Sequence, residues 1–217
     1  MANAEEQKIT LATPLSFATS FRFPLQSAIA RREVLIGAAL LLFLPGVGWV
    51  LNMGHRIQMV HNMQHGRPAW PAWRDPVALL RHGLVTLVGM IYWHAPGALV
   101  MAAGERLDLW PVRVLGAVLF FAGTVAVPGY MTHYCRDFAV KEVFSPRLAV
   151  RRIRGAGVAY WRAWSIAASA LALSFIGMAG LGIFFFVTSV WFWQVAGFSF
   201  ASVFTQTYSL RTDTKTE

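Results

Sequence analysis

The densest run of side chains that could bind a metal lies between residues 53 and 65. Three histidines, His55, His61 and His65, alternate there with methionines at positions 53, 59 and 63. Thioether sulfur and imidazole nitrogen are ligands that copper accepts, and on a helix His61 and His65 share one face. The pattern predicts a metal site formed by the three histidines.

The same run also fits an amphipathic helix at the membrane surface. Helical spacing gathers its apolar side chains on one face, namely Met53, Ile57, Val60 and Met63. On this alternative the histidines are polar side chains of an interfacial helix.

His94 is a separate candidate, because it lies near the middle of an apolar run. Ionisable groups inside a membrane are costly and are often functional. His94 could ligate a tetrapyrrole or relay a proton. In a structural role it would hydrogen bond to a carbonyl that Pro96 leaves without its helical donor.

A third candidate is a run of arginines that could bind lipid head groups. Ser145 and Pro146 predict a helix start, with a hydroxyl cap and a proline in the first turn. Apolar residues then alternate with arginines, which is typical of a helix in the head-group plane. The predicted head-group ligands are Arg147, Arg151, Arg152 and Arg154.

The segment from Trp70 to Trp73 reads as an aromatic anchor at the membrane surface. Asp75 and Pro76 then predict the cap and first residue of the next helix. Arg74 follows the anchor directly, and we expect it to contribute to head-group binding.

Composition places these candidates in a membrane protein. Of the 217 residues 56% are hydrophobic and 13% are charged, which is wrong for a water-soluble domain. The net charge of +9 is spread over short segments between apolar runs. That distribution favours anionic lipid as the partner over nucleic acid. Cys135 stands alone, which indicates a structural thiol.

Apolar runs long enough to cross a bilayer predict an all-α polytopic protein. Residues 84–103 and 114–131 each form one span, and the uncharged stretch 163–204 must fold back at its glycines into a hairpin of 158–178 and 183–206. Residues 34–53 form a broken segment, interrupted at Pro45 and Gly46, that is either re-entrant or a fifth span. The predicted organisation is a polar tail (1–32), one transmembrane domain (33–206) and a second polar tail (207–217).

Positive charge predicts the orientation. With a re-entrant first segment, 17 of the 19 Lys and Arg residues lie on one side, leaving Arg106 and Arg113 on the other. With a fifth span the count on that side is 13, with Arg56 assigned to a loop. Both schemes place the basic loops and the C-terminus in the cytoplasm of a bacterial inner membrane. No cleavable signal peptide is apparent in the first 30 residues.

Four segments resemble the bacterial and archaeal membrane proteins catalogued as domain of unknown function 4013. They are the broken apolar run 42–49, the polar helix 52–57, the Pro-x-Trp loop 68–75 and the basic helix 144–153. The resemblance covers about residues 33–205. It implies a polytopic helical fold, and it implies no activity.

No nucleophile elbow, Walker loop, zinc spacing or dinucleotide turn is present, so we do not expect an enzyme. The main hypothesis is a non-enzymatic protein, without a cofactor, that organises anionic lipid or serves as an accessory subunit. Its partners would be membrane lipid and either a membrane protein or a second copy of the chain. The alternatives are a small transporter or channel component and a subunit that binds a tetrapyrrole or copper.

Overall fold

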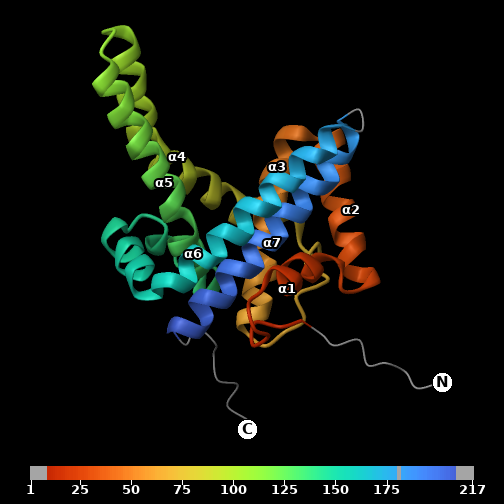
Figure 1. The fold of residues 1–217 in the computed structure, drawn as a ribbon. Coiled ribbons are helices and arrows are strands. Elements are labelled where there is room, and N and C mark those ends of the chain that lie inside the picture. The colour runs from red at the N-terminus through yellow and green to blue at the C-terminus, as the bar shows by residue number, and fades with distance from the viewer. Residues whose placement is uncertain (1–8, 180–181, 209–217) are drawn as a thin grey trace, which may run out of the picture.

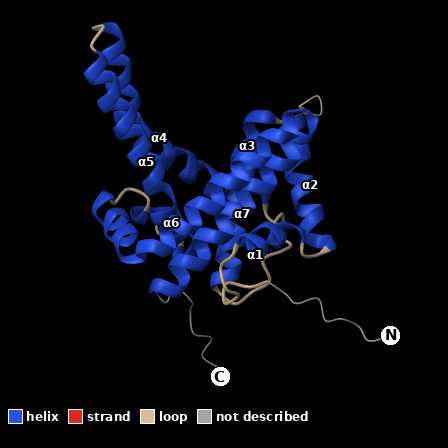
Figure 2. Ribbon diagram, viewed as in Figure 1, coloured by secondary structure: helices blue, strands red, loops and turns tan. Residues whose placement is uncertain are grey.

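A computed structural model describes residues 9–179 and 182–208, and within these ranges all regular structure is helical (Figure 2). Four helices are long and apolar enough to cross a membrane, which confirms the all-α polytopic fold. The α-helices are α1 (Phe17–Arg22), α2 (Ala28–Phe43), α3 (Pro45–Gln64), α4 (Pro76–Arg106), α5 (Trp110–Asp137), α6 (Pro146–Ile176) and α7 (Ile183–Tyr208).

The six longer helices form three antiparallel hairpins, α2–α3, α4–α5 and α6–α7. Figure 1 shows the turn between α2 and α3 and the tip of the α4–α5 hairpin pointing away from the end of the molecule at which α7 ends. Toward its tip the α4–α5 hairpin diverges from the other helices, whereas at its base α4 packs against α3. The loops between hairpins therefore lie away from the hairpin tips.

The broken segment 34–53 folds back on itself. α2 ends at Phe43, and Pro45 starts α3, where its missing N–H costs no helical hydrogen bond. The Asn52 side chain ties the two helices together by donating to the Gly37 carbonyl at 3.0 Å. The segment is a hairpin, as the re-entrant alternative predicts.

α6 contains a sharp bend between its basic segment and its apolar segment. Gly157 has φ 54° and ψ −132°, a conformation that residues with a Cβ rarely adopt. The basic segment of α6 turns into the apolar segment at this glycine (Figure 1). The predicted cap is wrong in one detail, because the Ser145 hydroxyl donates to the Lys141 carbonyl at 2.7 Å and does not cap α6.

The predicted boundary between a polar tail and the helical domain at residue 33 is too late in the chain. Phe23 is fully buried, stacking on Phe198 of α7 at 4.4 Å between ring centroids. Leu11 also lies in the core. The apolar side chains of this segment draw it onto the bundle, although its overall composition is polar. The predicted C-terminal tail lies outside the described residues from position 209 onward.

α3 and α4 approach each other so closely that a side chain does not fit between them. A Cβ at Gly54 would overlap the carbonyl oxygen of Leu79, and one at Gly83 would overlap that of Val50. Small residues permit such contact where lipid supplies no hydrophobic force between helices.

We expect Gly54→Ala to lower stability by about 2 kcal/mol, because overpacking forces the two backbones apart. The matched control is Gly46→Ala at the start of α3, where an added Cβ meets nothing within 4 Å. The melting temperatures of the two variants are compared in detergent, with size-exclusion chromatography as the measure of how much folded protein remains after heating. Equal melting temperatures would contradict the close packing of α3 on α4.

Candidate functional site

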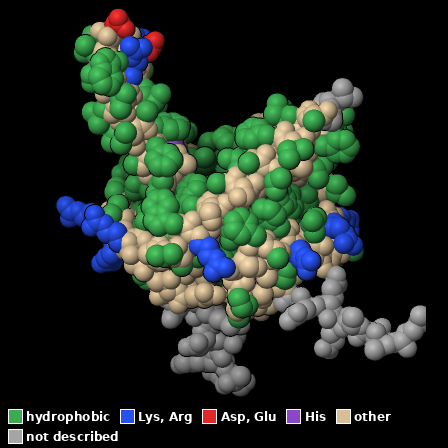
Figure 3. Space-filling model, viewed as in Figure 1, with side chains coloured by type: hydrophobic (Ala, Val, Ile, Leu, Met, Phe, Trp, Pro, Cys, Tyr) green, Lys and Arg blue, Asp and Glu red, His purple; other side chains and the backbone are tan. Residues whose placement is uncertain are grey.

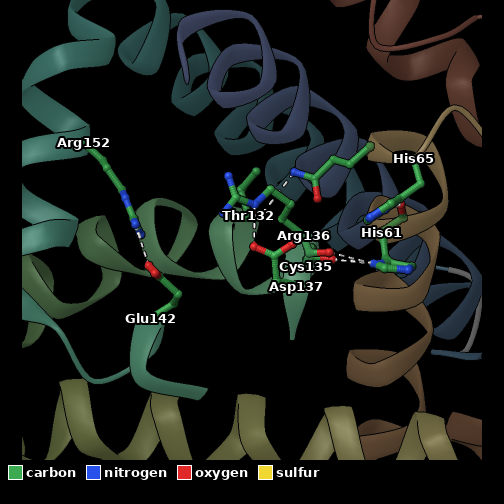
Figure 4. A network of polar contacts seen from close by, with 9 residues as sticks. His61, His65, Thr132, Cys135, Arg136, Asp137, Glu142 and Arg152 are labelled. Carbon is green, nitrogen blue, oxygen red and sulfur yellow. Dashed lines mark hydrogen bonds and ion pairs between the residues drawn. The ribbon is translucent and has the colours of Figure 1, made fainter. Parts of the chain in front are cut away.

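The structure brings together two of the three histidines that were predicted to bind a metal. The ring centroids of His61 and His65 lie 4.1 Å apart near the C-terminal end of α3. His61 Nδ1 donates to the Cys135 carbonyl at 2.7 Å, which ties α3 to the end of α5 (Figure 4). His65 Nδ1 donates to the His61 carbonyl at 2.8 Å. In the described part of the chain, no three His, Cys, Asp or Glu side chains cluster as a metal site would.

The apolar residues of the same run form one buried face of α3. Met53, Ile57, Val60 and Met63 are each less than one tenth exposed. The amphipathic helix that the sequence predicts is therefore present, but its apolar face packs into the protein core.

His55 does not join the other two histidines, because it is paired with a buried carboxylate. Its Nε2 lies 2.8 Å from Oε2 of Glu33 on α2, and both side chains are nearly inaccessible to solvent. Its ring stacks on Trp73 at 4.2 Å between centroids. The predicted site residue thus belongs to a contact between α2, α3 and the loop that precedes α4.

Glu33 also holds that loop directly. Its Oε2 accepts from the Ala72 N–H at 3.0 Å, and its backbone carbonyl accepts from Trp73 Nε1 at 3.2 Å. The aromatic anchor of the sequence analysis is therefore fastened inside the protein. We call Glu33, His55, Ala72 and Trp73 the loop anchor.

Sequence reasoning missed Glu33, which follows Arg31 and Arg32 and reads as part of an exposed charged group. One signal was available. Glu33 lies three residues after Ala30 and four before Gly37, on the helical face that carries small residues and is buried.

His94 lies on α4 with both ring nitrogens bonded within the protein. Nδ1 donates to the Met90 carbonyl at 2.7 Å, so Nε2 accepts from the Thr124 hydroxyl of α5 at 3.0 Å. Ligation of a tetrapyrrole iron through Nε2 would require the bond to Thr124 to break. The geometry fits a histidine that joins α4 to α5.

Three of the four arginines predicted on the basic segment of α6 point outward. Arg147, Arg151 and Arg154 are exposed and, with Pro146 and Val150, line a shallow surface hollow. We call this hollow the basic groove. Arg74, predicted as a further head-group ligand, is also exposed, on the loop between α3 and α4.

Arg152 differs from its neighbours, because it points toward the loop after α5. Its Nη2 pairs with Glu142 at 2.5 Å, and only 11% of its side chain is exposed (Figure 4). The structure uses this arginine to fasten the basic segment of α6.

Arg56 is not on a loop, where the charge count placed it. It lies on α3, and its guanidinium carbon lies 4.6 Å from the centroid of the Trp193 ring on α7. It lines a cavity of about 320 Å³ formed by residues of α3, α4, α5, α6 and α7. The sequence signal for this position is helical spacing, since Arg56 follows the apolar Met53 by three residues.

No protein-family model, curated protein or solved structure matches this chain. The resemblance to domain of unknown function 4013 remains a prediction.

The loop anchor predicts that Glu33→Ala lowers stability by about 3–5 kcal/mol, because it leaves His55 and the Ala72 N–H without their buried partner. Glu33→Gln keeps an oxygen acceptor, so the expected loss is smaller. The measurements are thermal unfolding and the rate of tryptic cleavage after Arg74, which should rise in the alanine variant.

The control is Glu105→Ala, which removes the 3.2 Å pair with Arg113 in which Glu105 is 72% exposed. Exposed pairs contribute about 0–1 kcal/mol. Cleavage after Arg74 at the wild-type rate in Glu33→Ala would show that the anchor does not hold the loop.

Proposed function

We propose that this protein is a non-enzymatic membrane protein that binds anionic lipid at its basic end, and so organises lipid or positions an associated complex. The observation that carries the proposal is the basic groove. Its three exposed guanidinium groups stand on one short helical segment that bends away from the apolar part of α6.

The spacing of the groove suits phosphate. Arg147, Arg151 and Arg154 follow one another at intervals of four and three residues, which places them on one face of a helix. Arginine presents a rigid fork of donors that matches phosphate oxygens. Val150 supplies an apolar floor between them, as expected of a segment at the boundary between head groups and acyl chains.

Charge is distributed unequally between the two ends of the molecule. Figure 3 shows Lys and Arg side chains around the end of the molecule at which α7 ends, whereas the tip of the α4–α5 hairpin carries both signs. At that tip Arg113 pairs with Glu105 and with Asp108, each at 3.2 Å. The positive charge at the basic end is therefore less neutralised by neighbouring carboxylates than the charge at the hairpin tip. This favours contact of the basic end with the anionic cytoplasmic leaflet.

This charge asymmetry also supports the proposed orientation, with the basic groove and the C-terminus in the cytoplasm of a bacterial inner membrane. Because Arg56 lies in the helix bundle and not on a loop, the number of Lys and Arg residues assigned to the cytoplasmic side falls by one. The excess of positive charge still lies on the same side.

The test replaces Arg147, Arg151 and Arg154 together by Gln. Each cation near a charged membrane surface contributes about 1 kcal/mol, so the variant should lose about 3 kcal/mol of preference for anionic lipid. The preference for phosphatidylglycerol over phosphatidylcholine is measured in mixed vesicles, from quenching of tryptophan fluorescence by brominated lipids.

The matched control is Arg106→Gln with Arg113→Gln at the opposite end, which should leave the preference unchanged. Added salt should weaken the wild-type preference, because the exposed charges are screened. A triple variant with the wild-type lipid preference would rule out the basic groove as the binding surface.

A further inference from the structure

We propose that the cavity beside Arg56 binds a single-chain amphiphile with a carboxylate head, such as a fatty acid. The Arg56 guanidinium would hold the carboxylate, and the apolar walls would hold the chain. This site is separate from the basic groove and does not depend on lipid binding there.

The protein provides a dedicated position for this arginine. Its aliphatic stem runs past Gly197 of α7, where an added Cβ would lie only 3.1 Å from Arg56 Cγ and 3.3 Å from Cδ. Its head lies against the Trp193 ring at 4.6 Å from the centroid. A glycine and a tryptophan one helical turn apart therefore hold the arginine in the cavity wall.

The charge of Arg56 has no anionic partner in the described residues. Across residues 9–179 and 182–208, no Asp or Glu oxygen lies within 4.0 Å of the Arg56 guanidinium, the limit for an ion pair. The guanidinium also donates no hydrogen bond to these residues. The aromatic contact offsets only part of the cost of removing a cation from water. A guanidinium offers five N–H donors, so an anion in the cavity would supply both hydrogen-bond acceptors and a counter-charge.

The rest of the cavity is suited to hydrocarbon. Its volume is about 320 Å³, at the lower end of the range for small-molecule sites. The wall is mainly apolar and comes from residues such as Val60, Met90, Val127, Leu171 and Phe200. Figure 3 shows the apolar surface hollowed between the α4–α5 hairpin and the rest of the molecule. An acyl chain could enter there from the lipid.

Charge matching favours a carboxylate over a phosphate monoester. The lining contains one arginine and no Lys, Asp or Glu. A carboxylate carries one negative charge and pairs with the guanidinium fork through two parallel hydrogen bonds. A phosphate monoester carries nearly two charges at neutral pH, and the lining would neutralise only one of them.

The experiment measures binding of palmitate to the purified full-length protein in detergent by isothermal titration calorimetry. Palmitate should bind wild type about 10- to 100-fold more tightly than methyl palmitate, because a hydrogen bond to a charged group is lost in the ester. It should also bind more tightly than palmitoyl lysophosphatidic acid. These comparisons need no variant, so they stand even where a substitution prevents folding.

Arg56→Met should weaken palmitate binding by a similar factor and leave methyl palmitate binding unchanged. Arg106→Met, at an exposed arginine of α4, is the matched control and should bind palmitate as wild type does. The triple Gln variant of the basic groove should also keep palmitate binding.

Three results would overturn the inference. Equal binding of palmitate and methyl palmitate would show that the head group is not recognised. Wild-type palmitate affinity in Arg56→Met, or loss of palmitate binding in the triple Gln variant, would place the ligand elsewhere. Tighter binding of lysophosphatidic acid would replace the carboxylate by a phosphate head.

Discussion

The packing of this protein depends on close contact between helix backbones. Helices that already lie in lipid gain little by hiding apolar side chains from one another, so they associate where small residues let backbones touch. α3 and α4 meet at Gly54 and Gly83, and α4 and α5 meet at Gly97 and Gly116, where an added Cβ would collide with the partner helix. The outer part of the α4–α5 hairpin can therefore diverge from the other helices and still remain a tight pair.

This divergence has a structural consequence. The cavity beside Arg56 lies among α3, α4, α5, α6 and α7, where the α4–α5 hairpin separates from the α6–α7 hairpin. Close glycine contacts hold α3 to α4 and α4 to α5, and space remains where the α4–α5 hairpin parts from α6 and α7. A bundle of evenly packed helices would have filled that space with side chains.

Several polar side chains in the bundle join neighbouring helices. His94 and the Glu33–His55 pair bond to partners on other helices, and Tyr160 of α6 donates to the Val125 carbonyl of α5. These bonds satisfy groups that would be costly to bury alone, and they fix the helices relative to one another. Arg56 differs from these side chains, because its head lines a cavity and rests on an aromatic ring.

The sequence by itself determined the helical class and the approximate spans, because a bilayer requires about 20 apolar residues for each crossing and every backbone group must be bonded internally. It also determined the cap at Asp75, whose Oδ1 accepts from the N–H groups of Val77 and Ala78. These features depend on local spacing and on single-residue chemistry.

Only the tertiary structure decided which polar residues meet. Glu33 and His55 are 22 positions apart, and Arg56 reaches Trp193 from the other half of the chain. Local patterns placed Glu33 with exposed arginines, Arg56 on a loop and His55 with His61, because charge and helical spacing say nothing about the partner helix. Contacts between distant segments depend on how the hairpins pack, so the loop anchor and the cavity could be found only in the folded protein.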